Sequence, residues 1–177
     1  MRVLGIDPGT VNTGWGVVEG EGSRLAHRSS GVIRCQGALP QRLMRIYDAL
    51  QRIFKDHEPH CVSLEKTFVG DNVQTAFRLG EARGAILVAA AQAGVTVCEY
   101  APAEIKVAVA GSGRAAKEQM QMMVARLLGL SDVLASDQAD ALGAAICHLH
   151  TSRFAARVGD AVVVEALSRQ RRRTLRR

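Results

Sequence analysis

The chain opens with the sequence RVLGIDPG at residues 2–9. The apolar residues Val3, Leu4 and Ile6 predict a short buried strand, and the Pro-Gly pair after Asp7 predicts a tight turn. A carboxylate at the tip of a buried strand is costly to desolvate unless a positive charge meets it. This stretch therefore predicts the central strand of a sheet, ending in a carboxylate that needs a cationic partner.

Three further acids occupy comparable positions: Glu65 ends the apolar segment CVSL (61–64), and Asp137 and Asp140 precede the apolar stretch 141–146. Each has an ordinary explanation when taken alone. Asp7 can form a turn with its own backbone, many strands end in a charged residue, and acids suit the first turn of a helix. If Ser136 is the N-cap, Asp137 and Asp140 lie in that first turn and share one face. Together, the four acids indicate a site for an oxygen-seeking divalent ion such as Mg²⁺.

The remaining sequence predicts strands and helices in a recognisable order. Strands are expected at 13–19, 25–34, 61–65 and 96–100, the first two joined by a turn at 20–23 and the third parallel to a neighbour. Helices are expected from 39 to before Pro59, over 72–93, from Pro102, over 115–128, and from Ser136 to about Ala156. This order predicts an α/β fold with a five-stranded mixed sheet flanked by helices. We expect one domain over residues 1–156 and a basic, flexible tail over 157–177.

The net charge of +6 comes from the C-terminus. Six of the 23 lysines and arginines lie in the last nine residues, so the rest of the chain balances 17 basic against 17 acidic side chains. Such a tail is suited to a polyanion, although it could serve solubility alone. Any nucleic-acid surface on the domain must therefore come from local clustering of basic residues.

No apolar run is long enough to cross a membrane, and because the chain enters a strand pattern at once we expect no signal peptide. The four cysteines are scattered and form no CxxC pair, which gives no support to a zinc or redox motif. Reduced thiols in a cytoplasm are the expectation.

Three segments carry a family resemblance: LGIDPG at 4–9, LEKTF at 64–68 and DQADAL at 137–142. With LGEARG at 79–84 and the pair Ala116-Lys117, they resemble, in order and separation, the RuvC family of crossover junction endodeoxyribonucleases. These enzymes resolve Holliday junctions in bacteria. The resemblance implies a ribonuclease-H-like fold and a homodimer that binds a four-way DNA junction and nicks two opposing strands symmetrically. It also implies RuvA–RuvB branch-migration machinery as a partner.

The resemblance also assigns roles to residues. It carries the catalytic and metal-binding roles onto Asp7, Glu65, Asp137 and Asp140, with two Mg²⁺ ions per site and Mn²⁺ as a substitute. Phe68 matches the aromatic residue used against junction bases, for which stacking is the physical basis. Lys106 and Lys117 match basic residues near the cleaved strand.

Two other classes of protein remain as alternatives. A non-catalytic junction-binding module could keep the same fold, but it would have little reason to retain a costly cluster of four acids. A phosphotransferase of the actin and hexokinase type has a similar first loop, but it needs two lobes and a chain roughly twice as long. A nicking assay on a four-way junction separates these possibilities.

Overall fold

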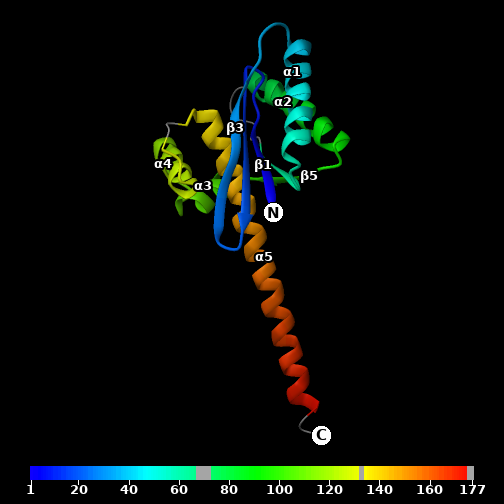
Figure 1. Cartoon of the computed structure of the whole chain (residues 1–177), viewed down its shortest axis with the longest axis vertical. Coiled ribbons are helices and arrows are strands. Elements are labelled where there is room, and N and C mark those ends of the chain that lie inside the picture. The colour runs from blue at the N-terminus through cyan, green and yellow to red at the C-terminus, as the bar shows by residue number, and fades with distance from the viewer. Residues whose placement is uncertain (67–72, 132–133, 175–177) are drawn as a thin grey trace.

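The computed structural model describes the backbone of residues 1–66, 73–131 and 134–174, and the side chains of these ranges up to residue 155, except Val73. Its body is built on one sheet, from which a long C-terminal helix extends (Figure 1). No helix in the described part of the chain is long and apolar enough to cross a membrane.

The sheet has five strands: β1 (Arg2–Asp7), β2 (Asn12–Glu21), β3 (Arg24–Arg34), β4 (Cys61–Glu65) and β5 (Thr96–Tyr100). Their order across the sheet is β3-β2-β1-β4-β5. The first three strands form an antiparallel meander, whereas β4 runs parallel to β1 and β5 runs parallel to β4. The predicted five-stranded mixed sheet is therefore confirmed, with β1 at its centre.

Helices cover both faces of the sheet: α1 (Leu39–His57), α2 (Val73–Gln92), α3 (Pro102–Ala110), α4 (Lys117–Leu128) and α5 (Ser136–Thr174). On one face, α1 and α2 pack over Leu4 and Ile6, and on the other face α3, α4 and α5 pack over Val3. The alternation of Val3, Leu4 and Ile6 between two cores is the period of two expected of a strand that is buried on both sides.

Three glycines let α5 approach the sheet closely. Gly5 and Gly16 are directly paired across β1 and β2, and Gly14 is paired with Asp7. A Cβ atom at Gly5 would lie 1.9 Å from the carbonyl oxygen of Ala141, and one at Gly14 would lie 1.9 Å from that of Asp137. The first turn of α5 is therefore held against the end of β1.

The start of α5 was predicted correctly, but the helix continues to Thr174 instead of ending near Ala156. Residues 157–174 include one glycine and no proline, so nothing in their backbone chemistry forces an earlier end. Ser136 is the first residue of the helix and not its N-cap, because the Ala139 amide already donates to the carbonyl of Ala135.

Candidate active site

The two strand-end acids lie on the same face and at the same edge of the sheet. Because β1 and β4 are parallel, Asp7 and Glu65 both end their strands at one edge. Alternation along β4 puts Glu65 on the side of Ser63, whose buried hydroxyl donates to the carbonyl of Ala144 in α5 at 2.7 Å. Alternation along β1 likewise puts Asp7 on the side of Gly5, against α5. Both carboxylates therefore face the helix that carries the other two acids.

Asp140 lies in the first turns of α5 and is held from two directions. The Ser136 hydroxyl donates to its Oδ2 atom at 3.5 Å, and the Lys117 Nζ atom lies 3.6 Å from the same oxygen. Lys117 is the first residue of α4, just after the break at residues 111–113. The lysine thus brings a positive charge to the carboxylate from a different element.

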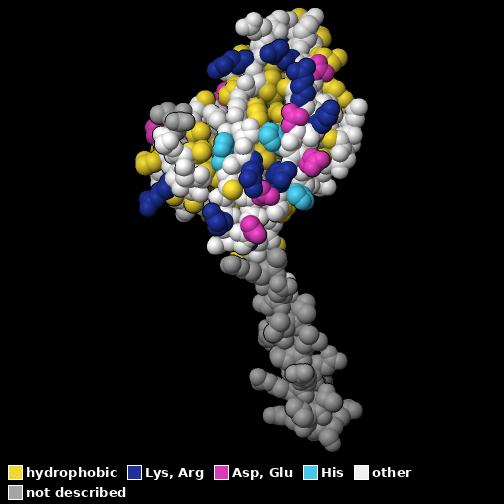
Figure 2. All heavy atoms as spheres, in the orientation of Figure 1, with side chains coloured by type: hydrophobic (Ala, Val, Ile, Leu, Met, Phe, Trp, Pro, Cys, Tyr) yellow, Lys and Arg dark blue, Asp and Glu magenta, His cyan; other side chains and the backbone are white. Residues whose placement is uncertain are grey.

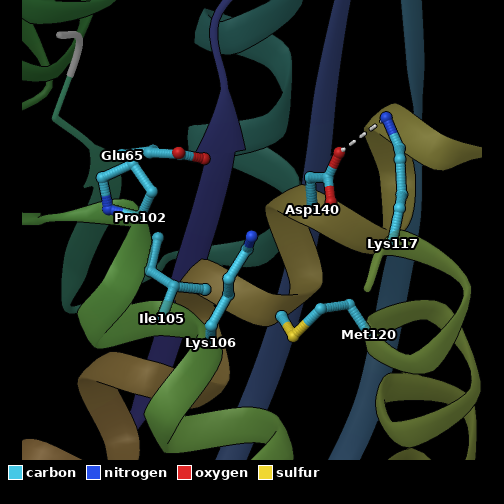
Figure 3. A pocket seen from close by; sticks show the side chains of 7 residues that line it. All are labelled: Glu65, Pro102, Ile105, Lys106, Lys117, Met120 and Asp140. Carbon is cyan, nitrogen blue, oxygen red and sulfur yellow. Dashed lines mark ion pairs between the residues drawn. The ribbon is translucent and has the colours of Figure 1, made fainter. Parts of the chain in front are cut away.

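A cavity of about 280 Å³ opens between these elements. Figure 3 shows Glu65 and Asp140 entering it from opposite sides, with Lys106 rising between them from α3 and Lys117 paired with Asp140. The apolar part of the wall comes from Pro102, Ile105 and Met120. Asp7 and Asp137 are not among the lining residues, but they act on the site electrostatically.

The pKa of Asp7 is raised to about 7, first by burial and then by the negative charges of Asp140, Glu65 and Asp137. Burial also raises the pKa of Glu65 and of Asp140, and each is affected by another member of the acid set. Lys117 lowers the pKa of all three groups. The structure therefore brings the four predicted acids into one electrostatic cluster in which negative charge exceeds the positive charge that meets it.

The donor set is suited to a hard divalent cation, because it consists of carboxylate oxygens without histidine or cysteine. In their present conformations, no three acidic, histidine or cysteine side chains of the described part of the chain lie close enough to share one ion. A cation would nonetheless suit this cluster, because it would offset both the burial of Asp7 and the repulsion from the neighbouring acids that together raise its pKa.

Both predicted DNA-contacting lysines, Lys106 and Lys117, line the cavity. Phe68, the third residue expected to contact DNA, lies outside the described residues. The two histidines that follow in α5 are not near the acids. His148 is buried and shares a 2.8 Å hydrogen bond with Tyr100, and His150 contacts the carbonyl of Ala108 at 3.0 Å.

Sequence reasoning missed Arg83. Its guanidinium donates from Nη1 to the backbone carbonyl of Glu65 at 3.2 Å and forms an ion pair with Glu99. It is the last charged residue before the apolar segment 84–91 of the helix, and a charge at that boundary was the available signal. The glycines Gly14 and Gly16 were also missed, although alternate glycines in a strand often mark a close backbone approach.

Comparisons with known proteins agree with this geometry. The model of the family "Crossover junction endodeoxyribonuclease RuvC" matches residues 3–148. The crossover junction endodeoxyribonuclease RuvC of Pelobacter propionicus is 47% identical over 170 residues, which cover 95% of this chain and 97% of that protein. The RuvC of Burkholderia thailandensis is 51% identical over 151 residues, covering 85% and 84%.

Solved structures give the same result. The T. thermophilus RuvC in complex with a Holliday junction substrate has a TM-score of 0.83 and 36% identity, covering 88% of this chain and 96% of that one. The yeast mitochondrial Holliday junction resolvase Ydc2 shares the fold with a TM-score of 0.61 at 12% identity. The chain belongs to the RuvC family of crossover junction endodeoxyribonucleases.

Proposed function

We propose that this protein is a metal-dependent, structure-selective endonuclease that resolves Holliday junctions by paired, symmetric nicks in two opposing DNA strands. The observation that carries the proposal is the convergence of Asp7, Glu65, Asp137 and Asp140, from β1, β4 and α5, into one cluster whose negative charge exceeds the positive charge that meets it. Family membership supplies the class of reaction, and the cluster supplies residues that can perform it.

The four acids would hold the metal ions, with Glu65 and Asp140 on opposite sides of the cavity and Asp7 at the end of the neighbouring strand β1. When bound, two Mg²⁺ ions, or Mn²⁺ in their place, supply a water nucleophile at neutral pH and stabilise the departing 3′ oxygen. The carboxylates must be ionised to bind, so a neighbouring positive charge that keeps them ionised assists binding. Lys117 has this effect on Asp7, Glu65 and Asp140.

Lys106 and Lys117 would also bind the phosphates of the strand to be cut, because both ammonium groups border the cavity that contains the acids. Phe68, three residues after Glu65, would stack on a junction base. Figure 2 shows basic and acidic side chains interspersed over the visible face, with no single basic field. We therefore assign DNA recognition to local contacts of this kind around the site.

A homodimer would provide two sites for two nicks. A surface groove between α1 and α2 is almost wholly apolar, and its lining residues are Pro40, Leu43, Met44, Tyr47, Gly84, Ala85 and Val88. Met44 and Val88 are 59% and 60% exposed. An apolar surface of this kind suits a second copy of the chain. RuvA–RuvB, the other expected partner, would act on the same junction as the dimer.

The direct test is to incubate the protein with a four-way junction and with linear duplex DNA, in Mg²⁺ and in EDTA. We expect paired nicks in the junction only, with 5′-phosphate and 3′-hydroxyl ends that a ligase can seal, and no nicks in EDTA. Tight junction binding without nicking in either Mg²⁺ or Mn²⁺ would instead identify a non-catalytic junction-binding module.

A further inference from the structure

Glu65 is the last residue of β4, and the peptide bond after it is held from both sides. The carbonyl oxygen of Glu65 accepts a hydrogen bond from Arg83 Nη1 at 3.2 Å, and the amide of Lys66 donates to the carbonyl of Tyr100 at 2.8 Å. One peptide plane thus has both its polar groups occupied, which restricts rotation about the bonds that join it to Glu65. The direction of the Glu65 side chain depends on that plane.

Arg83 is itself held in place. Its side chain is only 18% exposed, and it forms an ion pair with Glu99 of β5. Glu99 is paired with Leu64 in the sheet, so its side chain lies on the face covered by α2, whereas the Glu65 side chain lies on the opposite face. The planar guanidinium therefore joins α2 and β5 to the backbone of β4 and leaves the Glu65 carboxylate free to enter the cavity.

We infer that Arg83 is a positioning residue that fixes the Glu65 carboxylate for metal binding by clamping the carbonyl of Glu65 to Glu99. The inference rests on the proposed function, because it assumes that Glu65 is a metal ligand. Groups that orient metal ligands without touching the metal commonly change metal affinity or activity by roughly 10–100-fold when they are removed.

The clamp depends on geometry as well as charge. A lysine at position 83 keeps the charge and can pair with Glu99, but it lacks the rigid fork that serves two acceptors at once. Glutamine keeps a donor but loses the ion pair. A merely structural role would lower the free energy of unfolding without changing how much metal the folded protein needs.

The test compares Arg83→Gln and Arg83→Lys with the wild type and with Arg78→Gln, which changes an exposed arginine of the same helix. The readouts are the Mg²⁺ concentration for half-maximal junction nicking, the affinity for Mn²⁺ by titration calorimetry without DNA, and the thermal unfolding midpoint. We expect Arg83→Gln to need about tenfold more Mg²⁺ and to bind Mn²⁺ more weakly by a similar factor. Arg83→Lys should have a Mg²⁺ requirement and a Mn²⁺ affinity between those of the wild type and Arg83→Gln. Arg78→Gln should leave both metal readouts unchanged.

A folded Arg83→Gln protein whose Mg²⁺ requirement and Mn²⁺ affinity match the wild type would overturn the inference. If that variant does not fold, Glu99→Gln tests the inference instead, since it retains Arg83 but removes the carboxylate with which Arg83 forms its ion pair. A raised Mg²⁺ requirement in Glu99→Gln supports the clamp, and an unchanged one overturns it. Glu65→Gln separates this inference from the proposed function. Wild-type nicking by Glu65→Gln would contradict the proposed function itself. If Glu65→Gln loses nicking but the Arg83 variants keep the wild-type Mg²⁺ requirement and Mn²⁺ affinity, only the clamp is contradicted.

Discussion

Asp7 destabilises the metal-free fold, because its carboxylate is buried beside three other acids and its pKa is raised to about 7. The folded protein therefore binds more protons at Asp7 than the unfolded chain does between about pH 4 and pH 7. The free energy of unfolding falls as the pH rises through this range, and the full cost is present above it. Selection for stability alone would not retain such a residue, whereas binding a cation would offset the cost.

Replacing Asp7 with Asn should stabilise the protein in EDTA. At about pH 8 we expect the free energy of unfolding to rise by an amount on the order of a few kcal/mol. Near pH 4 most of this difference should be gone, because folded Asp7 is then protonated and the unfolded chain is roughly half protonated. Urea unfolding in EDTA from about pH 4 to pH 8 measures this effect. Asp56→Asn, which changes an exposed acid of α1, is the control. A gain in stability that does not depend on pH would contradict the electrostatic explanation.

Lys117 should affect the pH dependence of nicking. Its ammonium lies 3.6 Å from Asp140 and lowers the pKa of Asp7, Glu65 and Asp140. In Lys117→Gln these carboxylates hold their protons to higher pH, so the acidic limb of the pH–rate profile should move to higher pH. On that limb the rate should fall roughly tenfold for each unit by which the governing pKa rises.

Single-turnover nicking from about pH 5.5 to pH 9 tests this expectation, with Lys55→Gln, an exposed lysine of α1, as the control. The shift of the acidic limb in Lys117→Gln should become smaller as the Mg²⁺ concentration rises, because the bound metal replaces the positive charge of the missing lysine. A slower enzyme with an unchanged profile would show that Lys117 acts only on the DNA.

Among the elements, the contact between α5 and the sheet decides where the acids meet. The sequence predicted β1, β4 and the start of α5, because their apolar periods and flanking turns are local properties. It did not predict how closely α5 packs against the sheet. That distance depends on Gly5, Gly14 and Gly16 lying on one face of the paired strands β1 and β2. Their alignment is a property of the strand register, which local patterns do not specify.

Gly5→Ala should therefore be strongly destabilising. The added Cβ would lie 1.9 Å from the carbonyl oxygen of Ala141, a backbone atom that cannot move without displacing α5. We expect a loss of about 3 kcal/mol or more in the free energy of unfolding, and loss of nicking in the protein that still folds. Gly80→Ala in α2 is the matched control: its Cβ meets nothing within 4 Å, and alanine should stabilise the helix by up to about 1 kcal/mol. Similar stabilities for the two variants would contradict the close approach of α5.

At the scale of the whole molecule, the sequence predicted the sheet, its flanking helices and the four acids, but not the connections between them. Arg83 illustrates the limit, because its contacts with Glu65 and Glu99 join the three consecutive elements β4, α2 and β5 through side-chain geometry that no local pattern specifies. The length of α5 was also missed, since no residue of the sequence marks its end. Contacts of this kind depend on the arrangement of all the elements together.

The apolar groove between α1 and α2 should hold a second copy of the chain. Val88→Glu places a charge in this groove, where Val88 is 60% exposed. We expect the wild type to be dimeric at micromolar concentration and Val88→Glu to be monomeric, because burying the unpaired charge of the glutamate in the interface is costly. Met122→Glu, at another exposed apolar residue on α4, should remain dimeric. Sedimentation equilibrium of both variants measures the change, and a Val88→Glu dimer as stable as the wild type would place the interface elsewhere.

The most direct test of the central claim is the nicking of a four-way junction by Asp7→Asn in Mg²⁺, measured alongside its binding to the same junction. Loss of an outer contact to a metal ligand already costs roughly 10–100-fold, so loss of a ligand should reduce nicking by more than about a hundredfold. Binding should survive, because Lys106 and Lys117 remain in the cavity wall. Nicking by Asp7→Asn at the wild-type rate would contradict the assignment of the acid cluster as the active site.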